Sequence, residues 1–319
     1  MTTRPEAVDA VTGAFSYSGA AIARELQAAG RGVRTLTGHP DRAAPTAMEI
    51  DTRPLNFGDP AELTRSLRGV HTLYNTYWVR FARGHVDHQT AVANSRTLFE
   101  AAANAGVRRI VHVSITHPSA DSPYPYFRGK AQVEQILADV GVAYAIARPA
   151  ILFGGNDVLI NNIAWLLRHL PVFAVGGRGD YRIRGIHVED LARLCVQLGA
   201  RDDTVVVDAV GPQSLTFRQL VNAVRSAVGS HAIVVPVPAI LLTGLSHALS
   251  LALRDTLLTH EEYQAMVDGL ADSDAPTTGT IVFTDWVTEQ GPTLGRRYAN
   301  ELDRHFRRTG TLSHAASSS

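Results

Sequence analysis

A tyrosine and the only lysine of the chain stand four residues apart, at Tyr126 and Lys130. In a helix this spacing places both side chains on one face, one turn apart. A phenol with an unperturbed pKa of about 10 is a poor base at neutral pH, and a neighbouring ammonium lowers that pKa by favouring the phenolate. The pair therefore predicts general acid/base catalysis at a carbonyl or alcohol oxygen, with Tyr126 carrying the proton.

The composition indicates that Lys130 is not an ordinary surface charge. The other 29 of the 30 basic residues are arginine. A solvated charge is nearly indifferent to this exchange, whereas a site that needs a compact ammonium is not. With nine tyrosines in the chain, a randomly placed lysine would follow one at this spacing in about 3% of cases. Coincidence is therefore a poor explanation.

Hydroxyl and imidazole groups precede this pair, where an apolar segment runs into a loop. Thr116 is expected to orient the substrate oxygen while hydride moves to or from a nicotinamide. Ser114 is expected at the cofactor, and His117 is a candidate substrate contact. Lys130 is expected to bond the nicotinamide ribose as well.

A second group of residues is suited to hold a phosphate. The segment Thr12-Gly13-Ala14-Phe15-Ser16-Tyr17-Ser18-Gly19 joins an expected strand to an expected helix, where backbone N–H groups and the helix dipole can bind a pyrophosphate. Serine replaces the middle glycine of a G-x-x-G-x-x-G spacing. The alternative is a plain strand-to-helix turn. The expected cofactor contacts in this segment are Gly13, Phe15, Ser16, Tyr17 and Gly19.

The end of the second expected strand bears on the choice between NAD and NADP, because an acidic residue there would hold the ribose hydroxyls of NAD. Thr37 and His39 stand at this point, and Arg42 follows in the loop. These residues favour NADP, with its extra phosphate, and leave NAD possible. The alternative for Arg42 is a solvated surface charge.

The elements that must position these residues alternate between strand and helix. Strands are expected at 7–12, 32–37, 72–76, 109–114, 143–147 and 205–209, and helices at 18–29, 90–105 and 131–140. This alternation is typical of a parallel sheet covered on both faces. We therefore expect an α/β fold with a Rossmann-like doubly wound parallel sheet and the site at the carboxyl ends of its strands.

The pattern changes after about residue 211 to long helical segments, at 216–228, 240–253 and 259–269. We expect a dinucleotide-binding domain over 1–155, completed by about 183–211, and a smaller, mostly helical substrate domain over 156–182 and 212–308. The active site is expected in the cleft between them. Residues 309–319 are of low complexity and are expected to be disordered.

Composition excludes several partner classes. Thirty basic and thirty acidic residues cancel, so we expect a small-molecule substrate rather than nucleic acid or an anionic membrane. The apolar stretch 239–253 is shorter than the roughly 20 residues of a membrane span. One cysteine and an N-terminus without a signal-peptide pattern predict a cytoplasmic protein. Oligomeric state stays open.

Three other features are interpreted without catalytic roles. His85 and His88 have a spacing that can bind metal, but no clear third ligand is near, so no metal site is expected. His187, followed by two acids, predicts a helix start with those acids at the positive dipole end. Cys195 is interpreted as a small buried hydrophobe rather than a nucleophile.

Over about residues 7–211 the chain resembles an extended or atypical short-chain dehydrogenase/reductase of the NAD-dependent epimerase/dehydratase-like group. The segments that carry the resemblance are TGAFSYSG, NSRTLFEAAANAGVRRIVHVS, YFRGKAQVE, ARPAILFGG and IHVEDLA. The C-terminal segments LLTHEEYQAMVDG, FTDW and GPTLGRRYANEL are similar to relatives of the accessory NAD(P)H-binding subunit of respiratory complex I.

The resemblance implies further roles. Asn94 matches an asparagine that supports the active site, Pro149 with Arg148 matches the turn beside the nicotinamide, and Asn56 falls at the adenine. Phe153 is a substrate-side candidate. Tyr77 and Trp78 replace small residues at the nicotinamide and are expected to shape or obstruct the substrate site. Asp9 in a buried strand is a further departure.

The leading function is that of an NAD(P)-dependent oxidoreductase acting on a carbonyl or secondary alcohol. A sugar-nucleotide epimerase is the first alternative, because it uses the same tyrosine and cofactor. A non-catalytic NAD(P)H-binding sensor or scaffold is the second. The loop after Thr116 lacks the Asp-Glu pair of sugar dehydratases, which argues against dehydration.

Overall fold

The computed structural model describes residues 7–38, 50–80, 87–238 and 259–300. His39, Arg42 and His85, the helix expected at 240–253 and the tail at 309–319 lie outside these ranges. The chain divides into two compact units. The first comprises residues 1–157, 181–216 and 265–286, and the second comprises 158–180, 217–264 and 287–319. Each is described by itself.

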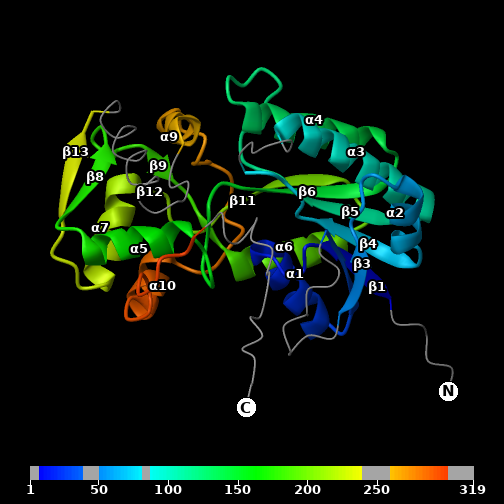
Figure 1. Cartoon of the computed structure of the whole chain (residues 1–319), viewed down its shortest axis with the longest axis horizontal. Helices are drawn as coiled ribbons and strands as arrows, with labels where there is room; N and C mark the ends of the chain where they lie inside the picture. The colour runs from blue at the N-terminus through cyan, green and yellow to red at the C-terminus, as the bar shows by residue number, and fades with distance from the viewer. Residues whose placement is uncertain (1–6, 39–49, 81–86, 239–258, 301–319) are drawn as a thin grey trace, which may run out of the picture. The chain divides into compact units, whose positions relative to one another are not determined.

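A seven-stranded parallel sheet forms the centre of the first unit (Figure 1). Its strands lie in the order β11-β6-β5-β4-β1-β2-β3. Their bounds are Val8–Thr12 (β1), Gly32–Thr37 (β2), Asp51–Pro54 (β3), Val70–Asn75 (β4), Arg109–Val113 (β5), Ala143–Pro149 (β6) and Val205–Ala209 (β11). Because β1 lies between β4 and β2, the strand order reverses there, as in doubly wound sheets. The predicted Rossmann-like α/β class is confirmed.

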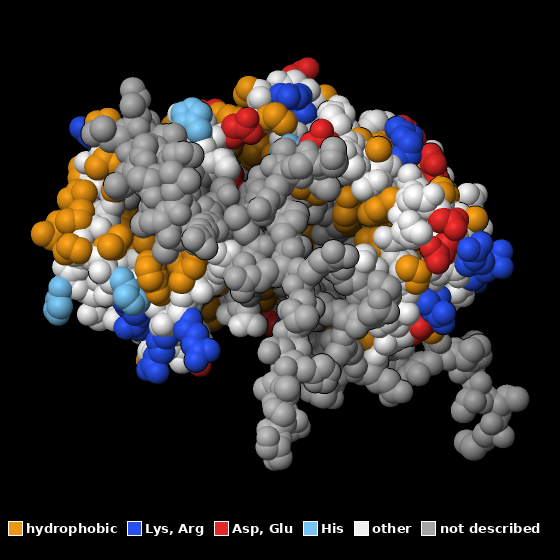
Figure 2. All heavy atoms as spheres, in the orientation of Figure 1, with side chains coloured by type: hydrophobic (Ala, Val, Ile, Leu, Met, Phe, Trp, Pro, Cys, Tyr) orange, Lys and Arg blue, Asp and Glu red, His pale blue; other side chains and the backbone are white. Residues whose placement is uncertain are grey.

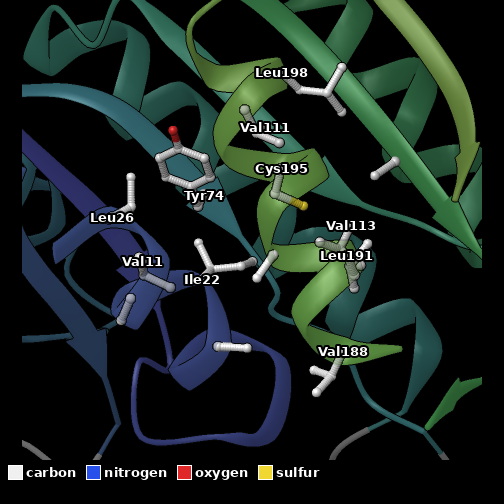
Figure 3. Packing of buried hydrophobic residues seen from close by; sticks show 14 of the residues in the cluster. Val11, Ile22, Leu26, Tyr74, Val111, Val113, Val188, Leu191, Cys195 and Leu198 are labelled. Carbon is white, nitrogen blue, oxygen red and sulfur yellow. The ribbon is translucent and has the colours of Figure 1, made fainter. Parts of the chain in front are cut away.

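Helices cover both faces of this sheet. On one face α1 (Tyr17–Ala28) packs against α6 (Val188–Gly199). Figure 3 shows this core, in which Val11 and Val111 of the strands meet Ile22 and Cys195 of the helices. Burial raises the pKa of the Cys195 thiol to about 12, which agrees with its interpretation as a buried hydrophobe.

The opposite face carries α2 (Pro60–Leu67), α3 (His88–Ala105) and α4 (Pro125–Asp139). Strand residues alternate between the two faces, so Ile110 packs on this side and its neighbour Val111 on the other. Leu63, Phe99 and Val133 are the buried contacts from the three helices. The helix that bears Tyr126 and Lys130 is therefore anchored to the sheet by its apolar face.

Asp9, a charge inside β1, is stabilised by Arg31. The guanidinium donates to both carboxylate oxygens at 2.7 and 2.8 Å, and the Thr72 backbone N–H donates to the same carboxylate at 3.2 Å. Asp9 is 1% exposed, and a buried carboxylate requires such partners. The pair joins the chain after α1 to the two central strands.

Smaller elements complete the first unit. In it β7 (Leu152–Phe153) pairs with β10 (Ile186–His187), and β9 (Arg182–Ile183) pairs with β12 (Leu215–Thr216). Residues 265–286, which the sequence analysis assigns to the smaller domain, belong to this unit. Arg184 holds them by donating to the carbonyls of Ser273 and Ala275 at 2.8 and 2.7 Å.

The second unit contains α5 (Leu159–His169), α7 (Phe217–Ala227) and a parallel pair of strands, β8 (Val172–Gly176) and β13 (Ile233–Val237). Arg168 of α5 donates to the carbonyls of Gly291 and Leu294. The remaining described helices are α9 (His260–Val267) and α10 (Phe283–Gln290).

Charged side chains of both signs are mixed on the visible surface (Figure 2). In Figure 2 acidic and basic side chains lie beside one another on the right-hand part of the visible face. Among the residues that the structure describes, no helix is both long enough and apolar enough to span a membrane.

Candidate cofactor and catalytic site

The turn between β1 and α1 has two positions that require glycine. Gly13 has a φ of +65°, a left-handed conformation that disfavours a side chain, and its N–H donates to the Leu36 carbonyl at 2.9 Å. A Cβ on Gly19 would lie 2.2 Å from the Gly13 carbonyl oxygen. The first turn of α1 can therefore approach the strand end closely only because both residues are glycine.

Ser16, in place of the middle glycine, bonds the turn itself. Its hydroxyl donates to the Gly13 carbonyl at 2.6 Å and its N–H donates to the same oxygen at 2.7 Å. Ser16 is the N-cap of α1 but makes no side-chain capping bond. The N–H groups of the first turn therefore receive no acceptor from the N-cap side chain. This arrangement suits a helix start that binds an anion.

Two more side chains hold this turn in place. Tyr17 donates from its hydroxyl to the Gly154 carbonyl at 2.7 Å. Thr35 of β2 accepts from the Ala14 N–H at 3.0 Å. Thr35 was not predicted as a site residue, although a polar residue at an inward strand position is a sequence signal for such a role.

The ribose and adenine end of the expected site is only partly described. Thr37 ends β2, and its carbonyl accepts from the Leu55 N–H at 2.8 Å. Asn56 uses its side chain within its own loop, because its amide donates to Glu62 at 2.8 Å and its oxygen accepts from the Gly58 N–H at 3.1 Å. The structure therefore gives Asn56 a loop-stabilising role.

A buried polar network joins the carboxyl ends of β1, β4 and β5. The Asn75 oxygen accepts from Thr12 at 3.2 Å and from the Tyr77 N–H at 3.1 Å. Its amide nitrogen lies 3.0 Å from His112 Nδ1. Because the oxygen is fixed as the acceptor, the amide donates to Nδ1, and a neutral His112 carries its proton on Nε2.

His112 is fully buried, and its Nε2 has no hydrogen-bond partner among the described residues. Burial first, and then the charge of Lys130, lowers the pKa of His112 well below its ordinary value. The imidazole is therefore neutral at physiological pH. Sequence patterns did not identify His112, because an isolated histidine inside an apolar strand carries no spacing signal.

Tyr77 and Asn94 contact each other directly. The Asn94 amide donates to the Tyr77 hydroxyl at 2.8 Å, and the Tyr77 ring packs on Phe57 with centroids 4.8 Å apart. Burial raises the pKa of Tyr77, although the bond from Asn94 opposes this shift. Asn94 thus supports a residue that follows β4.

The hydroxyls after β5 have different environments. Thr116 donates to the Leu270 carbonyl at 2.8 Å, and its N–H donates to the carbonyl of Pro149, the last residue of β6, at 3.1 Å. Ser114 is 4% exposed, and its Oγ has no partner among the described residues. His117 is exposed and has a φ of +55°. The hydroxyl left unpartnered is therefore that of Ser114.

Lys130 is buried beside the end of β5. It is 3% exposed, and its Nζ donates to the Val113 carbonyl at 2.9 Å. The same Nζ lies 4.7 Å from the centre of the Trp78 ring. Burial lowers the pKa of Lys130 to about 7, and the charge of Glu134 opposes this shift.

Aromatic rings surround Tyr126 on α4. Its ring meets the edges of Trp78 and His88, each with centroids 5.7 Å apart, and these two rings stack on each other at an interplanar angle of 2°. A Cβ on Gly129 would lie 2.8 Å from Cη2 of Trp78. His88 and Gly129 were not selected from the sequence, because their importance arises from contact with Trp78.

Phe153 and the histidine-acid segment lie elsewhere in the first unit. Phe153 is 2% exposed and packs against Phe283 and Trp286, with centroids 5.1 and 5.2 Å away. The structure therefore places its ring in an aromatic core. His187 is the N-cap of α6 and has the acids of the first turn after it, as predicted. No group of potential metal ligands occurs within the described ranges.

A nicotinamide nucleotide fits the residues at two points. The close approach of Gly19 to Gly13 leaves a backbone-lined turn at an uncapped helix start, which suits a pyrophosphate. Ser114 presents a buried hydroxyl without a partner among the described residues at the carboxyl end of a central strand, where a bound nicotinamide or its substrate can supply one.

The sequence of this chain is similar to one protein family and to several individual proteins. Residues 13–165 match the family described as NAD(P)H-binding. An uncharacterized protein of Mycobacterium tuberculosis is 28% identical over 67% of this chain, which spans only 23% of that relative's length. A (4-alkanoyl-5-oxo-2,5-dihydrofuran-3-yl)methyl phosphate reductase of Streptomyces griseus is 25% identical over 69% of this chain and 73% of its own. The 40 kDa NADH-ubiquinone oxidoreductase subunit of Neurospora crassa is 25% identical over 58% of this chain and 49% of its own.

Solved structures show the same fold. The triphenylmethane reductase of Citrobacter sp., complexed with NADP(H), has a TM-score of 0.73 at 18% identity and covers 89% of this chain and 99% of its own. The UDP-N-acetylglucosamine 4-epimerase of Bacillus cereus has a TM-score of 0.64 at 15% identity and covers 90% and 96%. Residues 13–165 thus match a family described as NAD(P)H-binding, and the chain has the same Rossmann-like fold as these two neighbours, in agreement with the sequence resemblance.

Proposed function

We propose that the chain is an NAD(P)H-dependent oxidoreductase of the short-chain dehydrogenase/reductase type, acting on a carbonyl or secondary alcohol. The observation that carries the proposal is the pair Tyr126 and Lys130, one turn apart at the start of α4, with the lysine ammonium buried at the end of β5. The nicotinamide, when bound, supplies or accepts the hydride.

Tyr126 transfers the proton to or from the substrate oxygen in this proposal. Lys130 has three N–H donors, and one is directed to the Val113 carbonyl. Its two other donors suit the ribose hydroxyls, and its charge favours the phenolate of Tyr126. The partial neutralisation that follows from a pKa of about 7 makes this assistance dependent on pH near neutrality.

Ser114 is proposed as the hydroxyl that orients the substrate, in place of Thr116. Thr116 already donates to the Leu270 carbonyl, whereas Ser114 Oγ is buried with no partner in the part of the chain that the structure describes. A buried hydroxyl without a partner is costly, so a ligand oxygen at this position would remove a penalty that the free protein carries. This argument supports Ser114 as the hydroxyl at the reacting centre.

NADP is the proposed cofactor, on the sequence of Thr37, His39 and Arg42 and on the NADP(H) complex of the Citrobacter structure. NAD remains the alternative. The proposed nucleotide domain spans 1–155 and about 183–211, and the proposed substrate domain spans 156–182 and 212–308 apart from residues 265–286, which belong to the first unit. The substrate is a small molecule in this proposal.

A second candidate function is a redox-nucleotide sensor that binds NAD(P)H without turnover. The engagement of Thr116 with Leu270 and of Lys130 with Val113 favours it, because both side chains then serve the fold. Only a measurement of turnover distinguishes this sensor from the proposed oxidoreductase.

The test measures oxidation of NADPH and NADH by the full chain against panels of ketones, quinones and sugar nucleotides. Tyr126→Phe should reduce kcat by roughly 10²-fold or more while leaving NADPH affinity unchanged. Tyr144→Phe, on β6, is the matched control and should keep the wild-type rate. Lys130→Arg should also lose activity, because a planar guanidinium misplaces both contacts. A wild-type protein that binds NADPH tightly and turns over no substrate would support the sensor.

A further inference from the structure

We propose that Trp78 is a positioning residue of the Tyr126–Lys130 pair, with its indole ring holding the lysine ammonium and setting the orientation of the tyrosine ring. This inference rests on the proposed function, because it concerns the same pair. Its first test, the titration of Lys130, does not depend on turnover.

The contact between Trp78 and Lys130 has the geometry of a cation–π interaction. Lys130 Nζ lies 4.7 Å from the ring centre, within the roughly 6 Å at which a cation is attracted to an aromatic face. Of the common aromatic rings, indole attracts cations most strongly. The Trp78 ring therefore stabilises the charged form of a lysine that is 3% exposed.

The described residues offer Lys130 little other compensation. Glu134, one turn further along α4, forms its ion pair with Arg148. His112 of β5 offers no negative charge, because burial and the charge of Lys130 hold its pKa well below the ordinary value. Within the described ranges no carboxylate forms an ion pair with Lys130. Its ammonium is stabilised there by the hydrogen bond to the Val113 carbonyl and by the contact with the indole face. Loss of either one should change the protonation of the amine.

Tyr126 is held by the same indole. The two rings meet edge to face at 81° with centroids 5.7 Å apart, a preferred aromatic geometry. His88 stacks on Trp78 and meets Tyr126 at 82°, so two parallel rings define the position of the phenol. Trp78 lies in the segment after β4 and His88 at the start of α3, so both ring contacts come from outside α4.

Two local costs indicate that position 78 requires an indole ring rather than another apolar side chain. Among the described residues, buried Trp78 Nε1 has no hydrogen-bond partner, a penalty that a phenylalanine or leucine in the same place would avoid. Gly129 lies inside α4, where glycine is less favourable than alanine. A Cβ at Gly129 would lie 2.8 Å from the indole, so this glycine makes room for Trp78.

The single lysine makes the test direct. The full chain is labelled with ¹³Cε-lysine, and the Lys130 resonance is followed over pH by NMR. Fluoro-, difluoro- and trifluorotryptophan are incorporated in turn at position 78, because fluorine withdraws ring electron density with little change in volume. The same series at Trp165, which stacks on His169 in α5, is the matched control.

We expect the pKa of Lys130 to fall stepwise along the fluorinated series at position 78 and to stay constant in the series at position 165. A Lys130 pKa that does not change with fluorination of Trp78 would overturn the inference. In turnover assays Trp78→Leu should lower kcat more than Trp78→Phe, since phenylalanine keeps an aromatic face. Equal losses in the two variants would show a packing role and would also overturn it.

Failure of this inference is distinguishable from failure of the proposed function. If Tyr126→Phe kept the wild-type rate, Tyr126 would have no acid/base role, and this result would not depend on the pKa measured for Lys130. A flat fluorination series would remove the role of Trp78 even where Tyr126 proves essential.

Discussion

The Lys130 ammonium lies 4.7 Å from the centre of the Trp78 ring while it donates to the Val113 carbonyl at 2.9 Å. Position 130 thus combines a buried charge, a strand carbonyl and an aromatic face next to Tyr126. Burial lowers the pKa of this lysine to about 7, so its protonation changes near neutral pH.

Stability should depend on pH through Lys130. Its pKa is about 7 in the folded protein and 10.5 when unperturbed, so between these values the unfolded chain binds more protons. Stability contributed by this group therefore rises with pH through this window. From pH 7 to pH 9 the wild type should gain about 2 kcal/mol relative to Lys130→Met. Urea unfolding at both values checks this, and parallel curves for the two proteins would contradict it.

Gly19→Ala should weaken NADPH binding. The new Cβ would meet the Gly13 carbonyl oxygen at 2.2 Å, so the turn must open. Calorimetry should show a loss of more than tenfold, about 1.4 kcal/mol. Gly32→Ala is the matched control, since its nearest contact is 3.4 Å and ordinary. Unchanged affinity in a folded Gly19→Ala protein would place the pyrophosphate elsewhere.

Arg42→Ala tests the preference for NADP. An arginine beside the 2′-phosphate contributes to NADPH binding only, so NADPH affinity should fall by roughly tenfold while NADH affinity stays constant. Arg96→Ala, at an exposed position of α3, should affect neither nucleotide. The same loss for both nucleotides would remove the reason for preferring NADP.

Ser114→Ala and Thr116→Val should separate catalysis from stability. Ser114 Oγ has no partner among the described residues, so its removal should lower kcat by roughly tenfold or more with little effect on unfolding. Thr116→Val leaves the Leu270 carbonyl without its donor and should cost about 1 kcal/mol of stability. Steady-state kinetics with urea denaturation measures both. The reverse pattern would return the substrate-orienting role to Thr116.

Asp9→Asn should destabilise the first unit by about 1–3 kcal/mol, because Arg31 loses the partner of a pair in which Asp9 is 1% exposed. Asp51→Asn is the control, since that carboxylate is 38% exposed in its pairs with Arg34 and Arg53. Such exposed pairs contribute about 0–1 kcal/mol. Denaturation midpoints that shift equally in the two variants would show that burial of Asp9 is not decisive.

The elements of the sheet were largely predictable from the sequence. β2 and β11 have the predicted bounds, and the other four expected strands lie within a few residues of theirs. β3 and α2 were not predicted, since β3 is a short edge strand and alternates only weakly in burial. Strand edges and short segments depend on pairing with neighbours, which periodicity does not report.

The sequence by itself determined the features that depend on local spacing. Gly13 and Gly19 define the turn, and Tyr126 and Lys130 share a helix face because four residues make about one turn. The start of α6 after His187 was likewise a local signal. Each of these follows from the backbone conformation of a few consecutive residues.

Only the tertiary structure decided which partner each polar group has. Thr116 meets Leu270 across 154 positions, Asp9 meets Arg31 across 22, and Trp78 reaches Lys130 from the segment after another strand. Phe153, a candidate substrate contact from the sequence, packs against Phe283 and Trp286, which lie 130 or more positions further along the chain. The physical reason is that burial and hydrogen bonding are properties of the packed chain, because each partner depends on which elements meet and how closely their backbones approach.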